Sequence, residues 1–108
     1  MVTEPLGYLE FMSLVSGSAA VITDSGGVQE ETTFLGVPCL TLRPNTERPV
    51  TITDGTNRLV TLANVEQQLA QVLSAGRSTT WPVPPLWDGR AGERIAQTLS
   101  RALLWPPV

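Results

Sequence analysis

The chain has 108 residues, of which 42% are hydrophobic and 16% charged, and its formal net charge is −3 at pH 7. This length corresponds to about one small domain and is too short for two lobes that enclose a substrate. The composition is typical of a soluble globular protein. Seven basic residues stand against ten acidic ones and form no cluster, so we expect no nucleic-acid partner.

Several other classes of function are disfavoured by what the sequence lacks. No stretch approaches the roughly 20 apolar residues that span a bilayer, and the N-terminus does not resemble a signal peptide. We therefore expect no membrane association and a cytoplasmic location. The chain has no histidine, and its single cysteine, Cys39, lies in an apolar run that favours a buried core thiol. We expect no metal and no cofactor, and any catalysis would use carboxylates or arginines.

The first half of the chain predicts a helix followed by a βαβ unit. Apolar residues at helical spacing over residues 7–16 indicate a short packed helix with a mostly buried face. Residues 19–23 form a brief apolar run that suits an interior parallel strand. Residues 24–27 then supply a turn, residues 28–35 a helix, and residues 38–42 a second strand. This order implies a parallel sheet.

The second half predicts one more strand and two helices. Residues 43–55 lack periodicity and indicate an ordered loop or functional surface. The later elements are a strand over residues 58–62, a helix over 65–74, a surface segment over 78–85 and a closing helix over 89–104. The helix over 65–74 has Asn64 as its N-cap, and its apolar stripe consists of Val65, Leu69, Val72 and Leu73. We expect this closing helix to turn Ile95, Leu99, Ala102 and Leu103 inward.

The most informative local feature is a pair of glycines between a strand and a helix, Asp24-Ser25-Gly26-Gly27. Glycines allow a ligand to approach the backbone closely, and unpaired N–H groups at a helix start attract anions. The turn also lies at the carboxyl edge of the predicted sheet, where α/β folds bind ligands. A diphosphate would fit there, although on the glycines alone a tight turn that Asp24 or Ser25 caps is the favoured explanation.

A carboxylate one turn into the helix strengthens the ligand interpretation. Glu31 could accept hydrogen bonds from a ribose diol while the phosphates rest on the helix N-terminus. Because adjacent helical residues differ by about 100° in direction, Glu30 cannot face the same ligand. We expect Glu30 to point to solvent or to pair elsewhere, and a solvated helix surface is the favoured interpretation.

The loop over residues 43–49 carries two arginines that could clamp phosphate oxygens, Arg43 and Arg48. The alternative is a surface loop in which Glu47 and Arg48 are solvated. The loop sequence by itself favours neither.

Several ordered motifs together resemble the non-hydrolysing UDP-N-acetylglucosamine 2-epimerases. They are residues 23–31 (TDSGGVQEE), 35–40 (LGVPCL), 45–49 (NTERP) and 55–60 (GTNRLV), with residues 87–91 (WDGRA) as a looser version of the family's aromatic-Gly-Asp-Gly step. The resemblance covers almost the whole chain. It implies a Rossmann-like α/β domain, a parallel sheet flanked by helices, that forms the C-terminal half of a two-domain GT-B-type fold.

By motif, the resemblance also implies roles for particular residues. Ser25, Gly26 and Gly27 would contact the diphosphate of a UDP-sugar, Glu31 the ribose, and Arg48 the phosphates or the sugar. Tyr8 is a further candidate, but a core aromatic is the favoured interpretation.

The family interconverts UDP-N-acetylglucosamine and UDP-N-acetylmannosamine by eliminating UDP and adding it back. Its catalytic acids lie in an N-terminal domain, and it uses a histidine from the region before this segment. We therefore expect residues 1–108 to be a single partial domain that binds UDP, with no catalytic residue and no activity alone. The missing half would come from an N-terminal domain or a companion chain. The family further implies a homodimer and a role in cell-surface polysaccharide synthesis.

Two other functions remain open at this stage. The chain could be the nucleotide-binding domain of a UDP-sugar glycosyltransferase, which uses a similar Gly-Gly and glutamate, although the Thr46-Glu47-Arg48-Pro49 loop disfavours it. It could also be a non-catalytic domain that binds UDP-sugars or a protein partner, for which an exposed apolar surface would be the sign. Trp81, Trp87 and Trp105 could contribute to that surface, but packing of the C-terminal arm on the domain is favoured for them.

Overall fold

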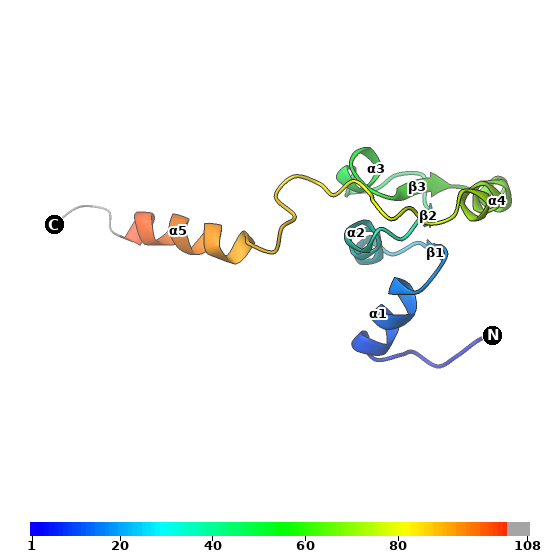
Figure 1. Cartoon of the computed structure of the whole chain (residues 1–108), viewed down its shortest axis with the longest axis horizontal. Coiled ribbons are helices and arrows are strands. Elements are labelled where there is room, and N and C mark those ends of the chain that lie inside the picture. The colour runs from blue at the N-terminus through cyan, green and yellow to red at the C-terminus, as the bar shows by residue number, and fades with distance from the viewer. Residues whose placement is uncertain (104–108) are drawn as a thin grey trace.

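The computed structural model describes residues 1–103 (Figure 1). In chain order the elements are α1 (Tyr8–Ser16), β1 (Val21–Thr23), α2 (Gly26–Leu35), β2 (Cys39–Leu42), α3 (Val50–Thr53), β3 (Asn57–Val60), α4 (Val65–Ala75) and α5 (Ala91–Leu103). The short helix α3 lies inside the segment expected to be a loop, and β3 begins one residue earlier than expected. The other elements appear in the predicted order.

The three strands form a parallel sheet in the order β1-β2-β3. Val21 pairs with Cys39, and Cys39 pairs in turn with Asn57. The predicted βαβ unit and its parallel sheet are therefore confirmed. Because all strands run the same way, their carboxyl ends lie at one edge, where the turn into α2 begins.

The apolar core lies between the sheet and α4. Leu40 of β2, Val60 of β3 and Val72 of α4 are buried together, with Val65 and Leu69 packed against them. The predicted stripe of α4 thus covers the sheet, apart from Leu73, which is exposed. Cys39 is fully buried, as expected for a core thiol.

The helix α2 buries polar side chains instead of apolar ones. Gln29, Thr32 and Thr33 are completely buried, whereas Phe34 is exposed. The helix starts at Gly26, two residues earlier than predicted, and ends at Leu35, followed by the C-cap Gly36, whose φ of 70° is left-handed. Polar burial of this kind requires internal hydrogen bonds.

The predicted inward packing of the first and last helices is wrong. In α1 only Val15 is buried, while several large apolar side chains are exposed, namely Tyr8, Leu9, Phe11 and Leu14. In α5 no residue is buried, and Ile95, Leu99, Ala102 and Leu103 are all exposed. Figure 1 shows the reason for α5, which stands away from the sheet at the end of an extended segment. Leu104, the expected end of this helix, lies outside the described residues.

The segment between α4 and α5 runs back over the ends of α1 and α2. Arg77 donates hydrogen bonds to the carbonyl oxygens of Ser16 (2.6 Å) and Leu35 (3.2 Å). The indole nitrogen of Trp81 donates to the carbonyl of Phe34, and its ring packs on Gly36. The expected packing of Trp81 on the domain is confirmed, and Trp105 lies outside the described residues. Within residues 1–103 no helix is both long enough and apolar enough to cross a membrane.

Candidate functional site

The turn from β1 into α2 presents an uncapped helix start. Ser25 is the N-cap residue in extended conformation, yet its side chain makes no capping hydrogen bond. Its own backbone N–H donates to Thr23 Oγ1 at 3.0 Å. The alternative of a turn capped by Ser25 is therefore not what the structure shows. The first N–H groups of α2, beginning with Gly26 and Gly27, have no partner within the helix, and the Ser25 side chain is exposed beside them.

The guanidinium group of Arg48 lies directly over Gly26. A Cβ atom added at Gly26 would overlap the Arg48 guanidinium and would lie 2.8 Å from Glu47 Oε1. Only a glycine allows this close approach of a side chain to the helix start. The structure thus brings Arg48 from a separate loop to the same place as the predicted Ser-Gly-Gly turn.

Carboxylates surround the arginines at this turn. Arg48 pairs with Glu30 and, at 2.8 Å, with Glu47. Glu47 also pairs with Arg43 at 2.9 Å. This hydrogen bond from Arg43 is the main reason why the pKa of the Glu47 carboxyl is lowered, and it raises the pKa of Arg43.

The pairing corrects the expectation that Glu30 is simply solvated. The Glu30 carboxylate remains half-exposed, but it faces Arg48 because Gly26 and Glu30 are four residues apart and share one face of α2. Any anion that binds Arg48 must compete with these carboxylates.

Glu31 lies on the neighbouring face of α2, four residues after Gly27. Together with Glu30, which was expected not to face the same ligand, it borders a largely apolar cavity of about 560 Å³ between α1, α2 and the arm that leads to α5. The lining residues include Tyr8, Met12, Phe34, Leu86 and Trp87. Tyr8 is 67% exposed and borders this cavity, so its favoured interpretation as a core aromatic is wrong.

A buried group of amide and hydroxyl side chains, which sequence reasoning missed, lies beneath Arg48. Gln29 accepts hydrogen bonds at Oε1 from Thr46 Oγ1 (2.6 Å) and from Asn57 Nδ2 (3.0 Å). Asn57 also donates to Thr51 Oγ1 at 3.1 Å, and its Oδ1 accepts from Thr41 at 2.6 Å. The available signal was the absence of an apolar stripe on the buried face of α2.

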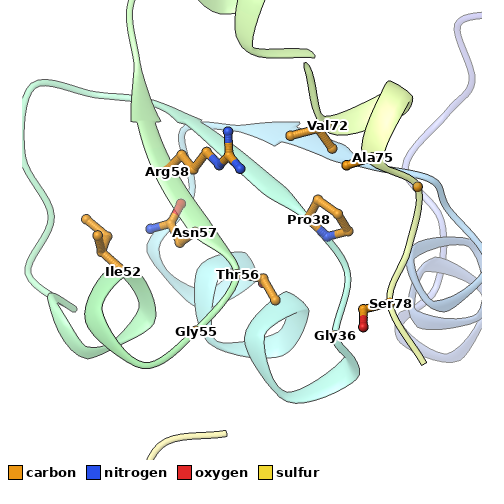
Figure 2. Close-up of a pocket in the computed structure, with 11 residues that line it drawn as sticks. Gly36, Pro38, Ile52, Gly55, Thr56, Asn57, Arg58, Val72, Ala75 and Ser78 are labelled. Carbon is orange, nitrogen blue, oxygen red and sulfur yellow. The ribbon is translucent and has the colours of Figure 1, made fainter. Parts of the chain in front are cut away.

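Another cavity, of about 390 Å³, lies at the amino ends of β2 and β3 (Figure 2). Its lining includes the residues just before the two strands, Pro38 and Thr56, and the first two residues of β3, Asn57 and Arg58. This is the edge opposite the glycine turn, whereas open α/β sheets bind ligands beyond the carboxyl ends of their strands. We therefore place the candidate site at the turn. Among residues 1–103, no three or more His, Cys, Asp or Glu side chains gather to hold a metal ion.

Comparison with known proteins agrees with these features. The sequence model of the family described as UDP-N-acetylglucosamine 2-epimerase matches residues 1–100. The chain belongs to this family. The UDP-N-acetylglucosamine 2-epimerase of Methanocaldococcus jannaschii is 45% identical over 100 residues, which make up 92% of this chain and 27% of that protein. That of Salmonella typhimurium is 48% identical over 102 residues, again 27% of its length.

Solved structures of family members have the same fold. The M. jannaschii UDP-GlcNAc 2-epimerase in complex with UDP-GlcNAc and UDP superposes with a TM-score of 0.72 and 42% identity, covering 92% of this chain and 27% of that one. The Neisseria meningitidis enzyme bound to UDP-GlcNAc superposes with a TM-score of 0.60 and 32% identity. This match covers 92% of this chain and 28% of that one. These epimerases have a GT-B fold, so the predicted fold class is confirmed. The chain spans little more than a quarter of the length of the relatives that it matches.

Proposed function

We propose that this chain binds the UDP part of UDP-N-acetylglucosamine and supplies the nucleotide-binding part of a UDP-N-acetylglucosamine 2-epimerase. The observation that carries the proposal is the Arg48 guanidinium over Gly26 at the uncapped start of α2. Backbone N–H groups, the positive end of the helix dipole and a guanidinium then converge on one point. This combination suits a diphosphate.

The remaining predicted residues fit the rest of a nucleotide. In the proposed complex the Ser25 hydroxyl and the N–H groups of Gly26 and Gly27 bind phosphate oxygens. Glu31 accepts hydrogen bonds from the ribose hydroxyls one helix turn further on. The base enters the apolar cavity beyond Glu31, where Tyr8 is exposed. The structures of relatives in complex with UDP-GlcNAc and UDP, or with UDP-GlcNAc, support a nucleotide site in this chain without assigning its individual contacts.

In the proposed reaction this site acts on the leaving group. Elimination of UDP from the sugar builds negative charge on the diphosphate, and preorganised donors lower the energy of that charged state. The chain has no histidine, and the carboxylates of Glu30 and Glu47 at this site are paired with Arg48. We propose that residues 1–108 are one partial domain and that proton transfer at the sugar needs groups from outside it.

We expect the chain alone to show no interconversion of UDP-N-acetylglucosamine and UDP-N-acetylmannosamine. Turnover by the purified chain would disprove the proposal that proton transfer needs groups from outside residues 1–108.

The binding proposal is tested by calorimetric titration of the chain with UDP, uridine and CDP. Arg48→Ala should weaken UDP binding by roughly tenfold or more without affecting uridine, because a guanidinium–phosphate contact contributes about 1.5–3 kcal/mol. Glu31→Ala should weaken both ligands, and CDP should bind less well than UDP.

Arg58→Ala is the matched control for charge. Arg58 is an exposed arginine on β3 that donates to Gln68, away from the turn. Equal losses in the Arg48 and Arg58 variants would show only a general charge effect. A folded chain that gives no heat with UDP would refute the proposed function for this chain.

A further inference from the structure

Both backbone polar groups of Arg48 are held by threonine hydroxyls. The Arg48 N–H donates to Thr46 Oγ1 at 3.0 Å. The Arg48 carbonyl accepts from Thr51 Oγ1 at 2.7 Å. Each hydroxyl thus has one hydrogen bond to Arg48 and is free to make another on its far side.

Those far-side bonds lead to one buried pair of amides. Thr46 Oγ1 donates to Gln29 Oε1, and Thr51 Oγ1 accepts from Asn57 Nδ2. Asn57 Nδ2 also donates to Gln29 Oε1. The result is a closed ring of hydrogen bonds that runs from the Arg48 N–H through Thr46, Gln29, Asn57 and Thr51 to the Arg48 carbonyl. We call it the Arg48 ring.

Gln29 also reaches the glycine turn from inside α2. Its Nε2 donates to the carbonyl oxygen of Ser25 at 3.1 Å. Gln29 is completely buried, and Asn57 is 3% exposed. One fully enclosed side chain therefore bonds to the Ser-Gly-Gly turn on one side and to the Arg48 ring on the other.

We propose that Gln29 is a positioning residue that fixes Arg48 over the helix start and so assembles the diphosphate part of the nucleotide site. This inference rests on the proposed function, which it extends to a residue that touches no ligand. Residues 43–49 lie in no helix or strand. One backbone bond, from the Thr51 N–H to the Arg48 carbonyl at 3.1 Å, is therefore supplemented by the threonine hydrogen bonds and by the ion pairs of the guanidinium. In a buried network every member needs its partner, because an unpaired polar group there is costly.

The test compares three variants that differ in which bonds they remove. Gln29→Met keeps an unbranched side chain of similar length and removes both the ring bonds and the bond to Ser25. Thr46→Val keeps the shape of threonine and cuts the ring at a single hydroxyl. Thr32→Val is the control, because Thr32 is equally buried on α2 but its hydroxyl donates to the helix carbonyls of Val28 and Gln29 and interacts with the Cys39 thiol, not with a side chain of the Arg48 ring.

Two measurements are made on each variant. Hydrogen exchange of the Arg48 backbone amide in the ligand-free chain reports whether the loop is held. The ratio of UDP to uridine affinity by calorimetry isolates the diphosphate contribution. We expect Gln29→Met and Thr46→Val to speed exchange at Arg48 and to lower this ratio by roughly tenfold, with uridine affinity unchanged. Thr32→Val should change neither, even where it lowers the melting temperature.

The outcomes separate this inference from the proposed function. Unchanged exchange at Arg48, or an unchanged affinity ratio in a chain that binds UDP, overturns the role of Gln29. If the unaltered chain does not bind UDP, the proposed function fails, and hydrogen exchange alone decides whether Gln29 positions Arg48. If Gln29→Met does not fold, Thr46→Val tests the ring through the affinity ratio alone, because Thr46 Oγ1 is itself the acceptor of the Arg48 N–H and its loss speeds exchange there directly; an unchanged ratio in this variant then overturns the proposal.

Discussion

Gly26 and Gly27 are neighbours at the start of α2 but have opposite surroundings. A methyl group at Gly26 would displace the ends of the Arg48 and Glu47 side chains, whereas one at Gly27 would meet no atom within 4 Å. We predict that Gly26→Ala weakens UDP binding by roughly tenfold with little loss of stability, because only flexible side-chain ends must move. Calorimetry with UDP and urea unfolding measure the two effects.

Gly27→Ala is the folding control for this prediction. Its backbone is compatible with alanine, because Gly27 has no positive φ. We expect it to raise the free energy of unfolding by about 0.5 kcal/mol, the low end of the range for replacing glycine in a helix. Gly26→Ala that binds UDP as well as the unaltered chain would contradict the close approach of Arg48.

The thiol of Cys39 predicts a pH dependence of stability. Burial raises its pKa, and hydrogen bonds with Thr32 and Thr41 only partly oppose this. The folded state therefore holds the thiol proton more tightly than the unfolded chain. The resulting stabilisation is complete below the unfolded pKa of about 8.5 and is lost as the pH rises through the folded pKa.

Cys39→Ala removes this group and tests its contribution. We expect the free energy of unfolding to fall less between neutral pH and about pH 10 in the variant than in the unaltered chain. Urea unfolding at both pH values measures the difference, and groups that titrate in both proteins cancel. Parallel pH profiles for the two proteins would argue against a buried thiol.

At the scale of single residues, the sequence predicts the glycine turn better than it predicts the buried side chains that hold the turn and Arg48 in place. The turn is marked by adjacent glycines and by Gly36 at the end of the helix, which are local signals. For Gln29 the only local signal is the absence of an apolar stripe on its helix, and a glutamine in a helix is usually exposed. Its partners Thr46 and Asn57 lie 17 and 28 residues away along the chain, so only the folded structure identifies it as buried.

At the scale of elements, the strands and α4 follow from local patterns, but the packing of α1 does not. The apolar residues of α1 have helical spacing, which predicts a helix and says nothing about what covers it. In the structure α1 is held mainly at its end, where Val15 is buried. Arg77 provides a polar attachment at the same place.

We predict that Arg77→Ala loosens α1. The Arg77 guanidinium bridges the carbonyl oxygens of Ser16, at the end of α1, and Leu35, at the end of α2. Loss of these bonds from an exposed side chain should lower the free energy of unfolding by about 1 kcal/mol. Hydrogen exchange should become faster in α1 than in α4.

Arg101→Ala serves as the control, because Arg101 is an exposed arginine in the last turn of α5. It removes the same charge and should leave both measurements unchanged. Equal effects of the two substitutions would mean that net charge, and not the bridge made by Arg77, governs the stability of α1.

At the scale of the whole molecule, α5 makes the chain elongated. The radius of gyration is 17.7 Å, whereas a compact domain of this length has about 13 Å. Every large apolar residue of α5 is more than half exposed. The sequence pattern predicted the amphipathic helix correctly, but it could not show that α5 buries none of its residues against the rest of the described chain.

This exposed stripe leads to a prediction about association. Ile95 and Leu99 are four residues apart and are 59% and 54% exposed, so they form one apolar face. Such a face on a free chain favours contact with other apolar surfaces in solution. We expect the purified chain to self-associate with increasing concentration and the double variant Ile95→Glu, Leu99→Glu to remain monomeric in light scattering.

The same double variant tests whether α5 contributes to the folded domain. Substituting two exposed residues should leave the melting temperature within about 2 °C of the unaltered chain, measured at low concentration where both are monomeric. Leu40→Ala, which empties a fully buried position, should instead cost about 2–5 kcal/mol. A large loss of stability in the double variant would mean that α5 packs against the sheet domain in solution. An unchanged melting temperature together with lost association would assign the apolar face of α5 to contacts outside this domain.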